Sequence, residues 1–318
     1  MNLSRRRALA PWVGLWVFLA LGCRKMPQET ARNVTDDLGH QVRIKRDVRS
    51  IVSLVPTNSE LVCLLDCGRL RGGTRYDRFP EELVRRVREN KIRIIGGGFD
   101  PNLEMIVDIG PDLILANGPS QHKATLPLRR MGFPVFSLYA QDIEWVKKDF
   151  LLLGEILDRS ETARAIVAEV EVELEEIRKQ FGGRKGKRVY LQTWPDPMIT
   201  VGKNSFSQSL LTLAGGINVF EDMPFDSGQV STEWIIQRNP EVMIFTDNHV
   251  EFVKRISGRP EWQQVDAVKN HHICLIHETN LRRRIRFAVG VKKLYECIYG
   301  HPVGAAAPLG EQAGRKGP

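Results

Sequence analysis

Two segments far apart in this chain follow the same pattern. PNLEMIVDIGPDLILA occupies residues 101–116 and STEWIIQRNPEVMIF occupies residues 231–245. In each, a glutamate is followed seven residues later by a proline, then by an acid and an apolar run. Such a repeat predicts two similar lobes, each with a helix, a proline-bearing turn and a buried strand. The repeated residues are Glu104, Pro111 and Asp112 in the first segment, and Glu233, Pro240 and Glu241 in the second.

Apolar runs and helical patterns alternate on both sides of residues 160–181. Candidate buried strands precede this segment at SIVSLVP, IRIIGGG, DLILA and MGFPVFSL, and follow it at KRVYLQTW, EVMIFTD and HHICLIH. This alternation predicts an α/β fold with mainly parallel sheets. Within residues 160–181 the apolar side chains recur at helical spacing, and a helix of this length measures about 33 Å. We therefore expect two α/β halves joined by one long helix that acts as a rigid strut.

The first 22 residues are interpreted as an export signal. A basic leader, MNLSRRRAL, precedes an apolar stretch that is too short for a membrane span, and small residues come directly before Cys23. This pattern is typical of a bacterial lipobox, with Cys23 as the lipidated residue; an ordinary signal peptide is the alternative. Sec and twin-arginine export both stay open. We expect residues 23–33 to be the lipidated cysteine and a tether, and the body to face the periplasm or the cell exterior.

Four further cysteines remain in the exported chain. Cys63 and Cys67 are four residues apart on an expected helix, which is a poor geometry for a disulfide. Cys274 and Cys297 could pair in an oxidising compartment, or all four could be buried free thiols. No CxxC motif occurs, so a thiolate zinc site has no support.

Charge and motifs exclude several functional classes. The chain has 318 residues and a net charge of +8, of which three charges are Arg5, Arg6 and Arg7 in the leader. Because no basic stripe is interleaved with aromatics, we expect no nucleic-acid partner. The sequence has no phosphate-binding loop, nucleophile elbow or HExxH motif. His271 and His277 would point to the opposite side of a strand from His272, so we expect neither a metal site nor a catalytic set.

Several motifs together resemble one known family. It comprises the substrate-binding proteins of ABC importers for metal chelates: cobalamin, ferric siderophores and haem. The resemblance runs from about Val34 to about Pro302. The longest motif, which begins RVYLQTW, resembles cobalamin-binding members most. The motifs are TDDLG, SLVPTNSELV, RYDRFP, IGGGFDPNLEMIVDIGPDLILA, RVYLQTWPDPMITVGKNSFSQSLLTLAGGINVFED and GQVSTEWIIQRNPEVMIF.

The resemblance implies an architecture. It predicts two Rossmann-like lobes joined by a single long α-helix, with a ligand cleft between the lobes. We place the N-terminal lobe at residues 34–141, the linker helices at 142–182 and the C-terminal lobe at 183–303. Residues 304–318 are small, polar and rich in proline and glycine, and are expected to be a disordered tail.

The resemblance also implies a role for the repeated glutamates. Glu104 and Glu233 match family positions that meet arginines of the two membrane subunits of the transporter. Exposed charge pairs of this kind steer docking and set its register. A plainer interpretation is that each glutamate stabilises the first turn of its helix through the helix dipole. Both interpretations can hold together.

Residues on the cleft loops are candidates for ligand binding. Aromatic side chains suit flat macrocycles. A cobalamin binder would have tryptophans at two places where this chain has Asn117 and the pair Asp226 and Ser227. The four arginines in LRRRIRF would suit an anionic chelate. The alternative is that these arginines form a solvated helix face. The candidate ligand-binding residues are Tyr76, Phe99, Asn117, Trp194, Phe225, Arg282 and Arg283.

These patterns predict a lipoprotein that binds a metal chelate, works as a monomer and is not an enzyme. A corrinoid is the first ligand hypothesis and a ferric siderophore or haem the second, with no covalently bound cofactor. The partners are the permease dimer with its ATPase, and the membrane through the lipid anchor. The alternative is an enzyme or ligand sensor on the same scaffold. Glutamates 104 and 233 inside the cleft would favour that alternative, and separated glutamates on the outer face would favour docking.

Overall fold

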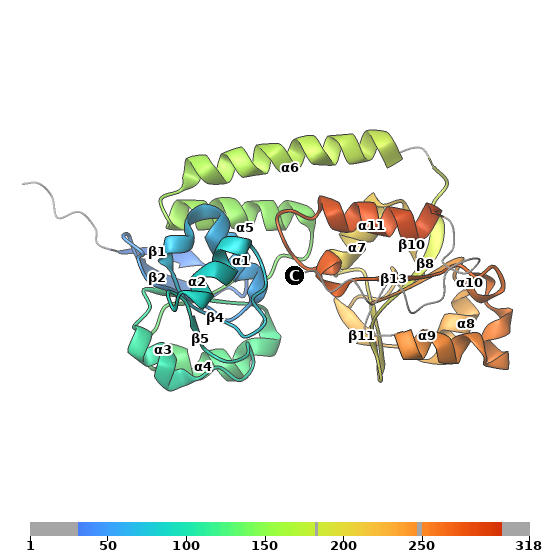
Figure 1. Ribbon diagram of the computed structural model, residues 1–318, viewed down its shortest axis with the longest axis horizontal. Coiled ribbons are helices and arrows are strands. Elements are labelled where there is room, and N and C mark those ends of the chain that lie inside the picture. Colours follow the sequence, from blue (N-terminus) through green and yellow to red (C-terminus); the bar gives the residue numbers. More distant parts are fainter. Residues whose placement is uncertain (1–30, 182–183, 247–249, 301–318) are drawn as a thin grey trace, which may run out of the picture.

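The computed structural model describes residues 31–181, 184–246 and 250–300. It contains two α/β lobes side by side, with one long helix lying along both of them (Figure 1). The predicted signal peptide, Cys23 and the tail after residue 303 lie outside the described residues. Within the described part of the chain, none of the helices combines the length and the apolar character that a membrane crossing requires.

The N-terminal lobe is built on a five-stranded parallel sheet. Its strand order is β5-β4-β3-β6-β7, and all four pairings are parallel. A separate antiparallel hairpin, β1–β2, precedes the sheet. The strands are β1 (Ala31–Thr35), β2 (Gln41–Lys45), β3 (Ile51–Ser53), β4 (Leu70–Gly73), β5 (Arg93–Ile94), β6 (Leu113–Ala116) and β7 (Val135–Ser137).

The C-terminal lobe is built on a mixed six-stranded sheet. Strand β8 pairs with β12 in parallel, and β12 pairs with β13 in parallel. The long β8 also pairs with β10 in parallel through its first residues and with β9 in antiparallel through its last, and β9 pairs with β11. The strands are β8 (Lys187–Pro195), β9 (Met198–Val201), β10 (Gly216–Asn218), β11 (Ser227–Gln229), β12 (Val242–Thr246) and β13 (Ile273–Ile276).

Helices connect these strands and cover the sheets. In the N-terminal lobe they are α1 (Pro56–Asp66), η1 (Cys67–Arg69), α2 (Glu81–Arg88), α3 (Leu103–Ile109), η2 (Pro119–Gln121) and α4 (His122–Arg130). The two linker helices are α5 (Ile143–Ile156) and α6 (Ser160–Phe181). In the C-terminal lobe they are α7 (Phe206–Leu213), α8 (Thr232–Arg238), α9 (Val250–Ser257), η4 (Pro260–Gln264), α10 (Asp266–Lys269), η5 (Glu278–Leu281) and α11 (Ala288–Tyr299). The predicted α/β fold with two lobes and a long joining helix is confirmed.

Helix α6 joins the lobes through a continuous apolar stripe. Ala163, Val170, Leu174 and Ile177 are buried at the spacing of one helix face. The helix packs on α5 and reaches α7 and α11 of the C-terminal lobe. One hydrophobic cluster therefore runs from the first sheet through α5 and α6 into the second lobe. Since this core crosses the junction, the helices hold the lobes in a defined relation.

The repeated segments form the same local structure in both lobes. Asn102 and Ser231 cap their helices by accepting hydrogen bonds from backbone N–H groups of the first turn. Each seven-residue helix, α3 and α8, ends at a left-handed residue, Gly110 (φ 57°) or Asn239 (φ 40°). The chain then passes through the proline into a buried strand, β6 or β12. This confirms the helix, turn and strand that the repeat predicts.

The acid after each proline accepts hydrogen bonds from the backbone at the start of the neighbouring strand. The Asp112 carboxylate accepts hydrogen bonds from the backbone N–H groups of Arg49 (2.9 Å) and Ser50 (3.1 Å), just before β3. The Glu241 carboxylate accepts one from the backbone N–H of Arg188 in β8 (2.9 Å). Each acid thus holds the start of the strand beside its own.

The disulfides correct one prediction. The structure pairs Cys63 with Cys67, a pairing that the sequence disfavoured. Helix α1 ends at Asp66, whose φ of −165° is not helical, so the chain turns before Cys67 and the two cysteines do not sit on one continuous helix. Cys274 pairs with Cys297, one of the two options that the sequence left open.

Replacing Asp112 tests the role of the acid after the proline. Burial raises the pKa of Asp112, but hydrogen bonds from Lys45, Arg49 and Ser50 together hold it below its usual range. Asp112→Ala should lower the free energy of unfolding by about 1–3 kcal/mol at neutral pH, measured by urea denaturation. Because the pKa of Asp112 is lowered on folding, this contribution should be present above about pH 4 and fade in stronger acid.

Glu241→Ala is the matched control for Asp112→Ala. Glu241 is exposed and accepts one backbone hydrogen bond, so its loss should cost about 1 kcal/mol or less. Equal losses for the two variants would contradict the proposed difference between them.

Candidate functional site

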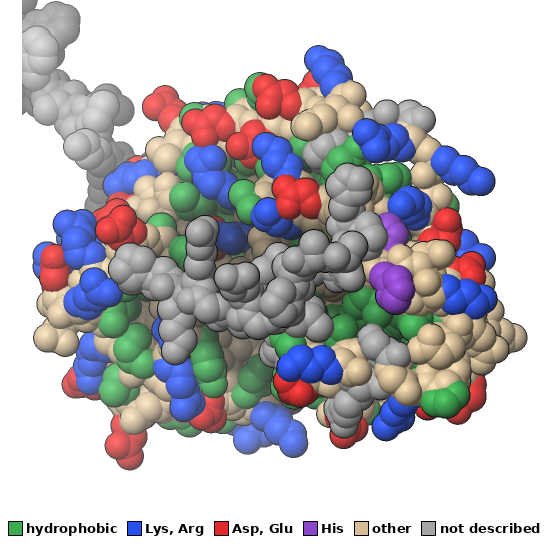
Figure 2. Space-filling view, turned by 45° about the vertical axis from the view of Figure 1, so that its right-hand side comes forward, with side chains coloured by type: hydrophobic (Ala, Val, Ile, Leu, Met, Phe, Trp, Pro, Cys, Tyr) green, Lys and Arg blue, Asp and Glu red, His purple; other side chains and the backbone are tan. Residues whose placement is uncertain are grey.

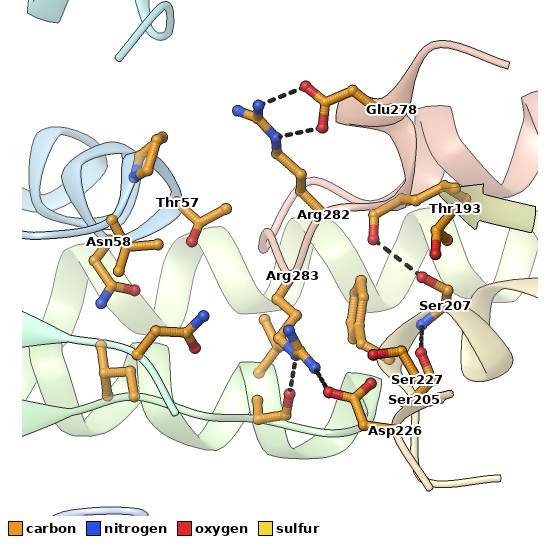
Figure 3. Close-up of a pocket in the computed structure, with 18 of the residues that line it drawn as sticks. Thr57, Asn58, Thr193, Ser205, Ser207, Asp226, Ser227, Glu278, Arg282 and Arg283 are labelled. Atoms are coloured by element: carbon orange, nitrogen blue, oxygen red, sulfur yellow. Dashed lines mark hydrogen bonds and ion pairs between the residues drawn. The ribbon is translucent and has the colours of Figure 1, made fainter. Parts of the chain in front are cut away.

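A cavity of about 490 Å³ lies between the two lobes. Helix α1 contributes Thr57 and Asn58 from one side, and Ser205 and Ser207 at the start of α7 lie on the other (Figure 3). The linker helix α5 contributes Val146 and Asp149. The loops after the parallel strands supply further groups, as is usual for ligand sites in α/β proteins.

Four of the seven predicted ligand-binding residues meet in the wall of this cavity. Tyr76, Asn117, Arg282 and Arg283 all line it, although they come from three separate parts of the sequence. Tyr76 follows β4, Asn117 follows β6, and the two arginines follow η5. The structure thus brings together the loops that the sequence singled out.

The other three predicted residues are not among those that line the cavity. Phe99 is 69% exposed, and Trp194 is 51% exposed with its Nε1 donating to the backbone oxygen of Asp196 (3.0 Å). Phe225 packs its ring against Gly228, where even a β-carbon would meet the ring at 2.8 Å. Any contact of these three with a ligand stays a prediction.

The four arginines of LRRRIRF are all paired with acids. Arg282 binds Glu278 through two hydrogen bonds, and Arg283 binds Asp226 (2.6 Å) in the cavity wall (Figure 3). Further along, Arg284 binds Glu60 (2.9 Å) and Arg286 binds Glu169 (3.0 Å). The positive charge of this segment is therefore balanced within the protein.

A polar contact joins the lobes at one side of the cavity. Asp226 of the C-terminal lobe accepts hydrogen bonds from both Arg283 and the Tyr139 hydroxyl (2.8 Å). The Arg283 guanidinium lies 4.9 Å from the centre of the Tyr139 ring and donates to the backbone oxygen of Ala140 (2.8 Å). Since Tyr139 and Ala140 follow β7, this cluster holds the loop after η5 against the N-terminal lobe.

Asp149 is a cavity residue that sequence reasoning missed. It lies on the buried face of α5, among Val146, Phe150 and Leu153, and is only 3% exposed. Burial, followed by the neighbouring Asp37 carboxylate, raises the pKa of Asp149 to about 9. An acid within an apolar stripe was the available signal, because buried carboxyl groups are rare unless they have a function or a partner.

The predicted docking glutamates lie on the outer surface. Glu104 and Glu233 are both exposed, in the first turns of α3 and α8. These two helices belong to different lobes and lie on the side of the molecule away from α6 (Figure 1). Neither glutamate lines the cavity.

Charged side chains of both signs lie on the surface, and His272 has a hydrogen-bond partner in the backbone. On the face shown in Figure 2, acidic and basic side chains are interspersed. His272 shares a hydrogen bond with the backbone oxygen of Cys297 (2.9 Å). Across residues 31–181, 184–246 and 250–300, no three His, Cys, Asp or Glu side chains gather as a metal site would require.

Fold and cavity together define a two-lobed solute-binding protein, with the ligand site between the lobes. The family model described as "Periplasmic binding protein" matches residues 51–279. The chain therefore belongs to the periplasmic binding protein family.

Individual relatives agree with this assignment. The chain is 29% identical over 277 residues to the uncharacterized ABC transporter substrate-binding lipoprotein YvrC of Bacillus subtilis, covering 83% of this chain and 84% of that protein. It is 29% identical over 205 residues to the vitamin B12-binding protein of Salmonella typhi, covering 64% and 74%. A solved structure of a possible iron-binding protein from Staphylococcus epidermidis superposes with a TM-score of 0.70 at 27% identity, covering 80% and 99%.

Replacing Asp149 by asparagine tests its protonation. The pKa of Asp149 is raised on folding, so its contribution to stability is complete below about pH 4 and declines as the pH rises toward 9. Asn does not titrate. The free energy of unfolding of Asp149→Asn should therefore rise relative to that of the wild type by on the order of 1 kcal/mol for each pH unit within this window. Thermal unfolding at pH 5 and pH 8.5 measures this gain. A constant difference in melting temperature across that range would contradict a raised pKa.

Proposed function

We propose that this chain is the substrate-binding lipoprotein of an ABC importer and that it captures a corrinoid. In this proposal the protein is exported, works as a monomer and is held at a bacterial membrane by a lipid on Cys23. It releases its ligand to a permease dimer that an ATPase drives. The family assignment and the names of the Bacillus and Salmonella relatives support this function.

The choice of a corrinoid as ligand is based on the charge balance of the cavity wall. Both arginines in its wall are already paired, Arg282 with Glu278 and Arg283 with Asp226. An anionic siderophore or the propionates of haem would meet arginines whose charge is already balanced, so the electrostatic gain on binding them would be smaller. The remaining polar wall consists mainly of uncharged hydroxyl and amide groups, including Thr57, Asn58, Thr193, Asn117, Ser205, Ser207, Ser227 and Thr246.

Such a wall fits the edge of a corrinoid. A corrinoid presents a flat macrocycle with uncharged carboxamides around its rim, and both can be met by aromatic faces and neutral hydrogen-bonding groups. Tyr76 lines the cavity and is 54% exposed; the Arg75 guanidinium lies 5.6 Å from the centre of its ring, and the rest of the ring surface is accessible to a ligand. A ferric chelate is the second candidate, supported by the possible iron-binding protein among the structural neighbours.

A ligand panel tests the proposed function. Protein lacking residues 1–23 should show saturable quenching of tryptophan fluorescence by cobalamin or cobinamide at micromolar or lower concentration, with weaker responses to haemin and ferric siderophores. Tyr76→Ala should weaken corrinoid binding by about tenfold, since an aromatic contact contributes on the order of 1 kcal/mol. Val172→Ala, on the exposed face of α6, is the control and should bind as the wild type does.

The outcome of this panel decides between ligand classes. Tight binding of a ferric siderophore without a corrinoid response would replace the corrinoid proposal by the iron-chelate one. No response to any member of the panel would remove both.

We propose that Glu104 and Glu233 dock on the permease. Asn102 and Ser231 provide the N-caps of these helices, and both glutamate side chains are exposed at the surface. They occupy equivalent positions on separate lobes, which suits a two-fold symmetric partner with a basic residue on each subunit. Glutamates inside the cleft would have favoured the enzyme alternative, and neither of these two lines the cavity.

A double substitution tests docking. Glu104→Ala combined with Glu233→Ala should reduce ligand uptake by cells by about tenfold or more while the affinity of the isolated protein for its ligand is unchanged. The control is Asp108→Ala, which removes another exposed acid from α3. Unchanged uptake in the double variant, or an equal loss in the control, would count against docking through these two residues.

A further inference from the structure

The loop between η5 and α11 lies between the two lobes, beside the cavity (Figure 1). It consists of Arg282–Phe287 and is here called the 282–287 loop. Ile285 and Phe287 are fully buried and belong to the large apolar core, which fixes the loop to the C-terminal lobe. Arg283 and Arg284 instead reach the N-terminal lobe. The loop is therefore anchored by apolar side chains on one side and makes two polar contacts across the lobes on the other.

The first inter-lobe contact is centred on Arg283. Its guanidinium lies 4.9 Å from the centre of the Tyr139 ring and donates to the backbone oxygen of Ala140 (2.8 Å). Asp226 completes the contact by accepting hydrogen bonds from Arg283 (2.6 Å) and from the Tyr139 hydroxyl (2.8 Å). The side chains of Arg283 and Asp226 are only 25% and 27% exposed, so salt and water screen their charges in part.

The second inter-lobe contact joins Arg284 to Glu60 of α1. Two nitrogens of the Arg284 guanidinium, Nε and Nη2, donate to Glu60 Oε1 at 3.2 and 2.9 Å. The same guanidinium lies 5.8 Å from the centre of the Phe79 ring in the N-terminal lobe. Glu60 is buried, and Thr57 and Asn58, less than one turn earlier on α1, line the cavity. Both inter-lobe contacts thus lie at the edge of the cavity.

The cavity between the lobes is small for the proposed ligand. Pockets for drug-sized molecules measure about 300–1,000 Å³. This cavity measures about 490 Å³, whereas a corrinoid macrocycle with its carboxamide side chains is larger than a drug-sized molecule. The lobes must therefore move apart to hold a corrinoid between them. Both inter-lobe contacts oppose that motion, because each one joins a residue of one lobe to a residue of the other.

We propose that the two inter-lobe contacts of Arg283 and Arg284 form an autoinhibitory latch, which holds the lobes together and lowers the affinity of the protein for a corrinoid. When only a fraction of the molecules can accept a ligand, the apparent Kd rises as that fraction falls. The latch thus reduces the association rate, while a corrinoid leaves lobes that are already apart. The size of the ligand rests on the proposed function; the latch itself is a property of the protein.

Removing the second contact tests the latch without altering the cavity wall. Neither Arg284 nor Glu60 lines the cavity. The double variant Arg284→Met with Glu60→Gln removes both charges, so no unpaired charge stays buried. It should bind cobinamide about tenfold more tightly than the wild type, the effect expected from loss of one charge-assisted contact. Stopped-flow tryptophan quenching should show this gain in the association rate. A variant with a damaged fold would bind more weakly, so damage does not imitate the expected result.

Tyr139→Phe tests the first contact by removal of one oxygen atom. Phe keeps its ring beside the Arg283 guanidinium but cannot donate to Asp226, and Tyr139 does not line the cavity. This variant should bind cobinamide about threefold more tightly, because one hydrogen bond to a carboxylate no longer opposes opening. Arg286→Met is the control. Arg286 belongs to the same loop but pairs with Glu169 of the linker helix α6 (3.0 Å), so this variant should bind as the wild type does.

Amide hydrogen exchange tests the latch without any ligand. In the double variant, the backbone amides of the 282–287 loop should exchange about tenfold faster than in the wild type, because local opening becomes easier. The strands β3, β6, β8 and β12 should keep their protection, which establishes that both lobes remain folded. Arg286→Met should leave the exchange of the first half of the loop unchanged.

The outcomes separate the latch from the proposed ligand. Unchanged or weaker cobinamide binding in the double variant would overturn the latch and leave the corrinoid proposal in place. Absence of corrinoid binding to the wild type would overturn the corrinoid proposal, and hydrogen exchange then decides about the latch. Equal exchange in the double variant and the wild type would overturn it, whereas faster exchange confined to the loop would support it for another ligand of the cavity.

Discussion

The apolar core that passes from one lobe to the other is the constraint on which the rest of this structure depends. Each lobe also buries a smaller apolar cluster of its own. Here one cluster includes residues from the first sheet, from α5 and α6, and from α7 and α11 of the second lobe. Opening the cavity widely would expose part of this cluster to water, at about 25 cal/mol per Å² of apolar surface. The linker therefore fixes how far the lobes can separate, and small lobe motions are the expected mode of ligand entry.

The cavity sits where this rigid linker meets the loops of both lobes. One wall is α5, which moves little if the core stays intact, while the other walls include α1, the start of α7 and loops that take part in polar contacts between the lobes. Tyr139, Asp226 and Arg283 form one such contact, and Arg284 with Glu60 forms another. Ion pairs and hydrogen bonds at a partly exposed junction can exchange with water at low net cost. The site thus combines a fixed wall with polar contacts between the lobes that can break and re-form.

The repeated residues have two roles: some stabilise the local structure of each lobe, and the glutamates lie on the surface. The capping residue, the left-handed helix end and the acid after the proline all have local partners, and these explain why both halves keep the same pattern. The repeated glutamates lie beside these caps, and the Glu233 carboxylate also accepts hydrogen bonds from Ser231 and from its own backbone N–H. Hydrogen bonding by Ser231 lowers the pKa of Glu233, which keeps its carboxylate charged and available at the surface. The helix-dipole and docking interpretations are therefore compatible.

The sequence by itself determined the features that depend on local pattern. The long helix from Ser160 to Phe181, the buried strands and the two helix–turn–strand repeats follow from apolar periodicity, capping residues and proline, which act within a few residues. The tertiary structure alone decided which charges are neutralised. Glu60 and Asp226 meet Arg284 and Arg283 from distant parts of the chain, and no spacing rule reports such pairings. The burial of Asp149 and the Cys63–Cys67 disulfide likewise depend on where the chain turns and what packs around it. Charge balance and burial are properties of three-dimensional neighbours, and for that reason the character of the cavity could be read only from the fold.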